Sequence, residues 1–60
     1  MAKLLELREK AFLTQVELAE KAKISEATVN RLEKGRQKPS FKTIRKIAKA
    51  LRVEPGKIDF

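Results

Sequence analysis

The side chains in this chain that could do chemistry are mostly cations, and they are unevenly placed. The 60 residues carry 15 Lys and Arg against 8 Asp and Glu, which gives a formal net charge of +7. Residues 1–30 hold five basic and five acidic side chains, whereas residues 31–60 hold ten basic and three acidic ones. A one-sided positive field favours an anionic partner, such as nucleic acid or an acidic membrane surface.

The side chains that most enzymes and metal sites need are missing from the sequence. It contains no Cys and no His, which excludes disulfides, the usual zinc sites and the Ser-His and Cys-His catalytic pairs. We therefore expect no catalytic residue, no metal site, no cofactor and no enzyme activity. The apolar runs are too short to span a bilayer and the N-terminus lacks a secretory signal, so we expect a cytoplasmic protein that does not contact a membrane.

The apolar spacing that must position these cations is helical throughout, and no stretch predicts a strand. A first helix is expected at about residues 2–11. Two helices joined by a short turn follow at about 14–34. The second of these spans about 26–34. A fourth helix is expected at about 41–51, and a short fifth helix or turn at about 55–60.

Local signals mark the ends of these helices. Thr14 and Glu17 have the spacing of a capping box, and Ser25 and Ser40 are good N-cap residues. Gly35 suits the position after the end of the third helix, where a positive φ is needed. The inward-facing residues predict the following core: Leu4, Leu7, Phe12, Leu18, Ala22, Ile24, Val29, Leu32, Phe41, Ile44, Ile47, Leu51 and Ile58.

Residues 15–34 have the spacing of a helix-turn-helix, with the small Ala19 where the two helices must approach closely. The surrounding residues resemble the Xre family of helix-turn-helix regulators, typified by phage repressors and Cro. The resemblance covers nearly all of residues 4–58. Its matching segments are Arg8, Leu13-Thr14-Gln15, Glu17 to Ala22, Ile24-Ser25, Ala27 to Val29, Arg31 to Gly35, Lys38 to Ser40, and Ile47 to Leu51.

This resemblance implies a fold, a partner and roles for named residues. The fold would be all-α, a compact four- to five-helix bundle of the phage-repressor DNA-binding type, as a single domain over residues 1–60. The partner would be double-stranded DNA, bound by a homodimer. The residues expected to contact bases are Glu26, Ala27, Thr28 and Arg31. Those expected to contact phosphates are Gln15, Ser25, Lys34, Arg36 and Lys38, and Arg8 with Glu33 would form a structural ion pair.

The sequence departs from the family pattern at three turns. Phe12, Lys23 and Arg52 each stand just past a helix end, where the family usually has Gly. A non-Gly residue in the left-handed conformation costs roughly 1–2 kcal/mol. Either these turns avoid that conformation or the domain carries strain.

The function expected from these features is sequence-specific DNA binding by a transcriptional regulator, most simply a repressor. Two alternatives stay open at this point. Small Xre domains also serve as antitoxins, whose main partner is a toxin protein. The segment 41–52 is also a basic amphipathic helix, a pattern typical of membrane- or partner-binding modules.

Overall fold

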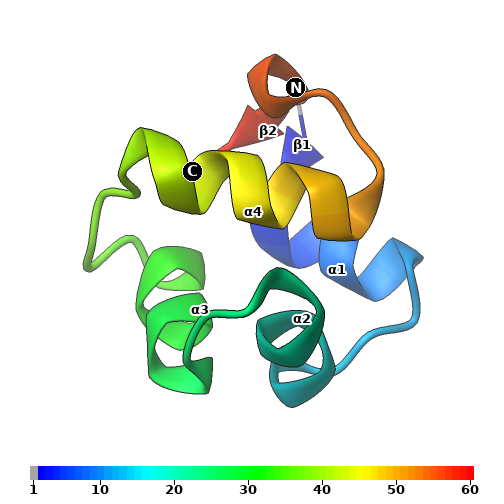
Figure 1. Cartoon of the computed structure of the whole chain (residues 1–60), viewed down its shortest axis with the longest axis horizontal. Helices are drawn as coiled ribbons and strands as arrows, with labels where there is room; N and C mark the ends of the chain where they lie inside the picture. Colours follow the sequence, from blue (N-terminus) through cyan, green and yellow to red (C-terminus); the bar gives the residue numbers. More distant parts are fainter. Residues whose placement is uncertain (1) are drawn as a thin grey trace.

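The computed structural model describes residues 2–60, so Met1, the first residue of the expected domain, lies outside the described part. In this part the chain forms four α-helices, one 3-10 turn and two very short strands (Figure 1). The elements in chain order are β1 (Ala2–Lys3), α1 (Leu4–Lys10), α2 (Gln15–Ala22), α3 (Glu26–Glu33), α4 (Phe41–Leu51), the 3-10 turn η1 (Pro55–Lys57) and β2 (Ile58–Asp59).

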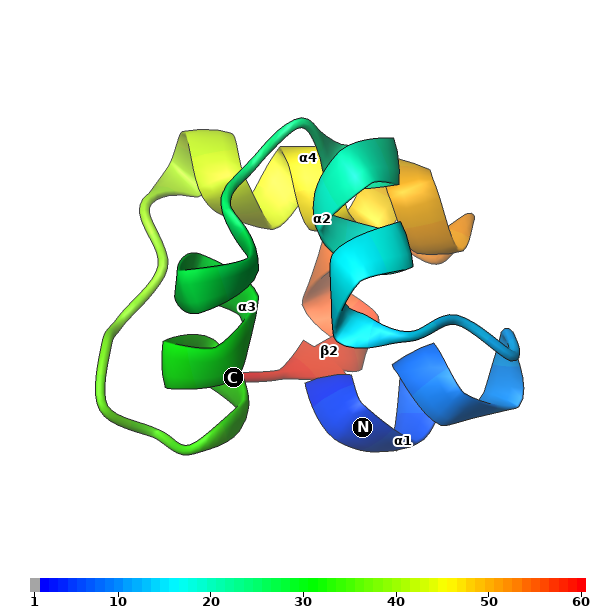
Figure 2. The same cartoon turned by 90° about the horizontal axis from the view of Figure 1, so that it is seen from below.

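The helices surround one small core, with α4 lying across α2 and α3 and with α1 on the far side (Figures 1 and 2). The buried residues are Leu4, Leu18, Ala19, Ala22, Val29, Leu32, Ile47, Ala48 and Ile58. Ala19 is 4% exposed, in keeping with the close approach of α2 to its neighbours that its small side chain predicts. The all-α fold is confirmed.

Two residues of the predicted core are in fact at the surface: Phe12 is 92% exposed and Phe41 is 87% exposed. Phe12 follows the end of α1 in a left-handed conformation, so the helical spacing that predicts its burial no longer applies there. Phe41 has the spacing of the apolar stripe, but it is the first residue of α4. The start of that helix extends past the packed core in Figure 1.

The two strands are a second difference from the sequence prediction. Ala2 pairs with Ile58 and Lys3 with Asp59 in parallel register. Strands of two residues are too short to show an alternating pattern, and their pairing depends on folding that brings the two ends of the chain together. The pair starts the chain in an extended conformation, so α1 begins at Leu4 rather than near residue 2.

The N-terminal ends of three helices are capped as the sequence predicts. Thr14 forms a full capping box with Glu17 at the start of α2. The hydroxyl of Ser25 accepts a hydrogen bond of 3.1 Å from the Thr28 N–H, and that of Ser40 accepts one of 3.2 Å from the Thr43 N–H. Each cap satisfies a backbone donor that the first helical turn leaves free.

The C-terminal ends of the four helices share one hydrogen-bonding pattern. Beyond α3, the Gly35 N–H bonds to the Leu32 carbonyl at 3.2 Å and the Arg36 N–H to the Arg31 carbonyl at 2.9 Å. These two bonds form a Schellman motif, in which the residue after the cap has a positive φ. Gly35 has φ of 70°, as expected.

The same motif follows α1, α2 and α4, but without glycine. Phe12, Lys23 and Arg52 each have φ of 58°, and each makes the corresponding backbone bonds. The turns therefore keep the left-handed conformation that the family builds with Gly. Each costs about 1–2 kcal/mol of backbone strain, because the Cβ atom crowds the neighbouring carbonyl.

Candidate nucleic-acid interface

The outward face of α3 is open to solvent. Glu26, Ala27 and Arg31 are exposed, and Thr28 is half-buried. A shallow hollow of about 340 Å³ lies on this face, lined by Gln15, Glu26, Ala27, Asn30 and Arg31. Val29 and Leu32 on the opposite side of α3 are buried in the core. The outward-facing residues of α3 therefore lie on a helix that is packed against the rest of the fold.

The predicted phosphate contacts flank this face on two sides. Ser25 is exposed at the N-terminus of α3, and Lys34, Arg36 and Lys38 are exposed after its C-terminus. The loop from α3 to α4 runs along the outside of the molecule, as Figure 2 shows on the left. The loop cations therefore lie next to the exposed helix, where they add a positive field beside it.

Arg31 is the long cationic side chain on the outward face of α3. Its Nε atom donates a hydrogen bond of 2.9 Å to Oε1 of Gln37 in the loop. An exposed side-chain bond of this kind is weak in water, so it orients the guanidinium without holding it. The side chain stays available for a bidentate contact with a polar ligand.

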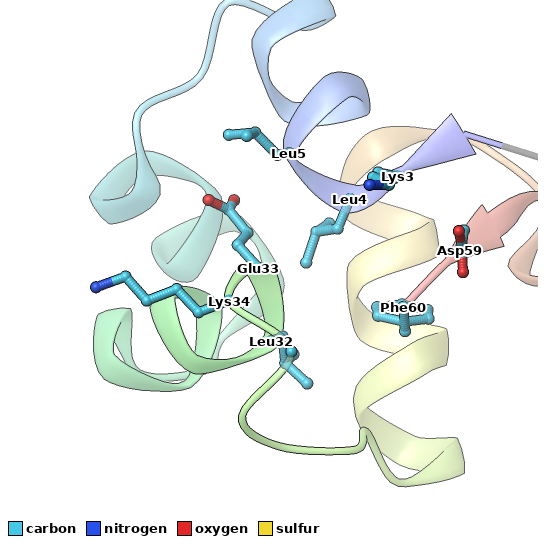
Figure 3. A pocket seen from close by; sticks show the side chains of 9 residues that line it. Lys3, Leu4, Leu5, Leu32, Glu33, Lys34, Asp59 and Phe60 are labelled. Carbon is cyan, nitrogen blue, oxygen red and sulfur yellow. The ribbon is translucent and has the colours of Figure 1, made fainter.

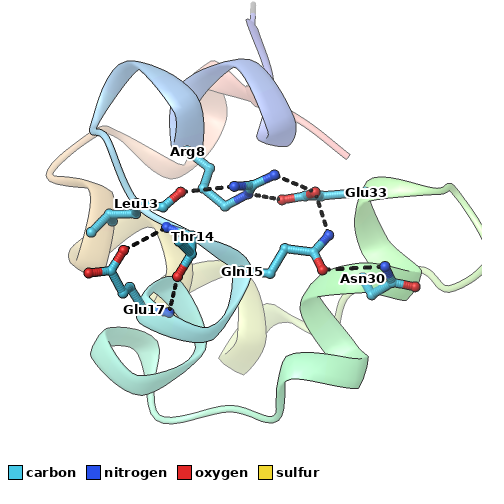
Figure 4. A network of polar contacts seen from close by, with 7 residues as sticks. All are labelled: Arg8, Leu13, Thr14, Gln15, Glu17, Asn30 and Glu33. Carbon is cyan, nitrogen blue, oxygen red and sulfur yellow. Dashed lines mark hydrogen bonds and ion pairs between the residues drawn. The ribbon is translucent and has the colours of Figure 1, made fainter.

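A polar network joins α3 to α1 and α2 (Figure 4). Arg8 donates from Nε to Oε2 of Glu33 at 2.6 Å and from Nη2 to Oε1 at 3.2 Å. Its Nη1 atom donates to the carbonyl of Leu13 at 2.8 Å. Gln15 donates to Oε1 of Glu33 at 2.9 Å and accepts a bond of 3.3 Å from the Asn30 amide.

The Arg8–Glu33 pair is largely shielded from water, with side-chain exposures of 13% and 5%. The hydrogen bonds from Arg8 to the Glu33 carboxylate raise the pKa of the guanidinium above its ordinary value. Within residues 2–60, no buried side-chain nitrogen or oxygen lacks a hydrogen-bond partner. The network therefore fixes α3 against the other two helices without leaving a buried polar group unsatisfied.

Gln15 and Asn30 are half-buried residues that the network places beside each other. Gln15 packs beside α3, as the family resemblance implies, and its amide bonds to Glu33 and Asn30. Asn30 is not among the residues that the sequence predicts to contact DNA, yet it lines the hollow on α3. Its position three residues before Glu33, on the same side of the helix, is the signal that could have identified it.

A second hollow of about 380 Å³ lies where the end of α3 meets the start of α1 and the chain's last residues. Lys3, Leu5, Asp59 and Phe60 are among the residues that line it (Figure 3). The Lys34 side chain extends away from Phe60 and Asp59 toward solvent in this view. Its ammonium group is therefore directed outward from the end of α3, where a phosphate could reach it.

A family model described as helix-turn-helix matches residues 4–58. The chain belongs to the Xre-like helix-turn-helix family. No individual curated protein matches it significantly. As a member of this family the chain is a helix-turn-helix regulator that binds double-stranded DNA.

The family assignment also bears on the other predicted properties. Xre-like helix-turn-helix domains are regulatory DNA-binding units and not typically enzymes. In residues 2–60, no group of three or more Asp and Glu side chains is arranged to hold a metal ion. None of the helices in this described part is long and apolar enough to cross a bilayer.

Proposed function

We propose that this Xre-like protein is a transcriptional repressor that recognises a specific operator with α3. The observation that carries the proposal is the exposed face of α3, with the cations Lys34, Arg36 and Lys38 exposed in the loop after its C-terminal end. An α-helix fits the major groove of B-DNA, where each base pair presents a distinct set of donors and acceptors.

Base recognition is assigned to four side chains of α3. Arg31 supplies a bidentate donor for guanine, and Ala27 and Thr28 offer methyl groups to thymine. To Glu26 we assign the role of acceptor for the amino group of cytosine. Glu26 also lies in the first turn of α3, where its negative charge complements the helix dipole.

Affinity is assigned to contacts with the DNA backbone. Gln15 lies at the start of α2 and Ser25 at the start of α3, and Lys34, Arg36 and Lys38 lie beyond the end of α3. If each of these three cations neutralises one phosphate, log K should fall with log salt concentration at a slope of about −3 per subunit. Two subunits would roughly double that slope.

A homodimer would place two copies of α3 in successive major grooves, about 34 Å apart on a near-palindromic site. Ile58 is buried in the core of the subunit, so its side chain is not free to contact a second subunit. Val53 is half-buried and lines a hollow of about 550 Å³ together with Ala2, Leu7, Glu54 and Lys57. This hollow is the surface we assign to self-association.

Selection from a random duplex library, followed by binding measurements on variants, tests the proposal. Arg31→Ala should relax one base position by about 1–3 kcal/mol of discrimination. Lys38→Ala should weaken binding to all duplexes alike and lower the salt slope by about 1. Lys10→Ala, at an exposed cation on α1, is the control and should change neither. An equal loss on every duplex from the Arg31 change would remove its assigned role.

The subunit count is tested separately by light scattering with and without the selected duplex. Two subunits per near-palindromic duplex are expected. A single subunit on the duplex would overturn the homodimer. A repressor should also lower expression from a promoter that carries the selected site, and unchanged expression would overturn that part of the proposal.

A further inference from the structure

A second cationic surface lies between the C-terminal ends of α2 and α4. These ends enclose a groove of about 400 Å³, which we call the α2/α4 groove. Its lining comprises Lys21, Ala22, Lys23, Lys46, Lys49, Ala50 and Arg52. Five of the seven residues are cations, and none is acidic.

The α2/α4 groove is separate from the face that α3 presents to DNA. It shares no residue with the hollow on α3 or with the cations of the α3–α4 loop. The loop joins the N-terminal end of α4, whereas Lys49 and Arg52 lie at its C-terminal end. A helix of 11 residues spans about 16 Å, so the two cationic surfaces are at opposite ends of α4.

The groove cations are not used within the fold. Lys21, Lys23, Lys49 and Arg52 are exposed, and Lys46 is half-buried. Within residues 2–60 the ion pair that the structure shows is Arg8–Glu33, which involves none of the five. Lys21 lies one helical turn from Glu17, whose pKa its charge helps to lower, and in the described part of the chain none of the five cations forms an ion pair.

Two of the five cations occupy positions where a cationic side chain carries a backbone cost. Lys23 and Arg52 both have φ of 58° at the residue that ends a Schellman motif. Glycine would form the same backbone bonds without strain. Cations near a helix C-terminus complement the helix dipole, and Lys21 and Lys49 already provide that charge in the last turns of α2 and α4. The same strain occurs at Phe12, outside the groove, so what distinguishes Lys23 and Arg52 is the positive charge that they add beyond that of Lys21 and Lys49.

The composition of the groove selects the kind of partner. Its lining combines the cationic groups with apolar atoms, which come from Ala22, Ala50 and the aliphatic stems of the lysines. Lysine and arginine side chains both pair with phosphate oxygens, the lysines as point charges. No aromatic side chain lines the groove, so single-stranded bases have nothing to stack on.

From this geometry we infer that the α2/α4 groove binds the phosphate backbone of a second DNA duplex, independently of its sequence. One protein would then hold an operator through α3 and a neighbouring DNA segment through the groove. The inference rests on DNA binding by α3 for the first duplex only. The second duplex contacts lysines and one arginine and is not read at its bases.

A bridging assay tests this inference with the full chain. The selected operator duplex is fixed to beads, the protein is added, and capture of a labelled duplex of random sequence is measured. The unaltered protein should capture it, and raising the salt concentration should abolish capture before operator binding is lost. Lys23→Gly/Arg52→Gly should reduce capture about tenfold or more and leave operator binding within twofold.

The double glycine variant is designed to stay folded, because it removes strain together with charge. Its melting temperature should rise by several degrees. Lys23→Gln/Arg52→Gln removes the same charges but keeps the strained backbone, so it should lose capture to the same extent without that rise. Lys3→Gln/Lys10→Gln removes two exposed cations from the α1 side and should leave capture unchanged.

The remaining outcomes count either against the proposed function or against the groove, and the assay distinguishes the two. Failure of operator binding in the unaltered protein would count against the proposed function, whereas operator binding without capture would count against the groove alone. Equal loss of capture in the α1-side control would show a general effect of net charge. Binding of a polyglutamate chain to the unaltered protein, lost in Lys23→Gln/Arg52→Gln and with no duplex captured, would assign the groove to an acidic protein partner.

Discussion

At its N-terminal end, α2 begins with a capping box and a side-chain network in which the polar groups of Thr14, Gln15 and Glu17 are hydrogen-bonded. At its C-terminal end, the same helix stops at Lys23, in a strained conformation beside a groove of exposed cations. The first end fixes the position of α3. The second leaves backbone strain and charge repulsion in place.

This difference indicates how the small domain divides its stability. A chain of 60 residues buries only about 60% of its unfolded surface, so its net stability is small and each kcal/mol matters. Precision at the start of α2 aligns α3 with the rest of the fold. The strain at the end of α2 lies at Lys23, in the short turn that connects α2 to α3.

The largest expected effect is at the network end of α2. Glu33→Ala leaves the Arg8 guanidinium shielded from water without its carboxylate, which typically costs about 3–5 kcal/mol. The variant should be largely unfolded near 25 °C by circular dichroism. Arg8→Met/Glu33→Leu should recover most of the loss, because both charges are then absent. A Glu33→Ala variant as stable as the unaltered protein would show that the network does not hold α3.

The second effect concerns the cap itself. Thr14→Ala removes the hydroxyl that accepts the Glu17 N–H at 3.1 Å and should cost about 1 kcal/mol. Urea denaturation measures this loss as a lower midpoint with an unchanged slope. Thr14→Ser keeps the hydroxyl and should be close to neutral. Equal losses in both variants would attribute the effect to packing of the methyl group.

The third effect has the opposite sign and lies at the other end of α2. Lys23→Gly relieves left-handed strain of about 1–2 kcal/mol, offset in part by the greater freedom of Gly in the unfolded chain. The net gain should be about 0.5–1 kcal/mol, seen as a higher melting temperature. Lys23→Ala removes the same charge but keeps Cβ, so it should give no such gain. Equal gains in both would attribute the effect to charge repulsion.

The smallest effect is a pH dependence at the start of α2. The hydrogen bond from the Thr14 N–H lowers the pKa of the Glu17 carboxyl. The cap contribution is therefore present above the unfolded pKa of about 4.3 and is lost as the pH falls through the lower folded value. NMR titration should show a Glu17 midpoint below about 4.3. Thr14→Ala keeps the donating backbone N–H and loses only the hydroxyl, so the midpoint should return only part of the way. A Glu17 midpoint at or above about 4.3 in the unaltered protein would contradict the hydrogen bond as its cause.

Much of the site could be predicted because its signals are local or belong to the family pattern. The caps at Thr14, Ser25 and Ser40 follow from hydrogen bonding within one helical turn. The Arg8–Glu33 pair joins residues 25 apart in the sequence, which no local rule connects; the family resemblance supplied it. The roles of individual residues toward DNA stay predictions.

What the sequence by itself determined is the all-α class, the helix-turn-helix and the excess of cations in residues 31–60, because periodicity, caps and charge are properties of short segments. The tertiary structure alone decided that Phe12 and Phe41 are exposed and that the chain ends pair as strands. It also decided that the cations of α2 and α4 share one groove. Those features depend on where helices end and how they cross, which is set by packing between segments distant in the chain.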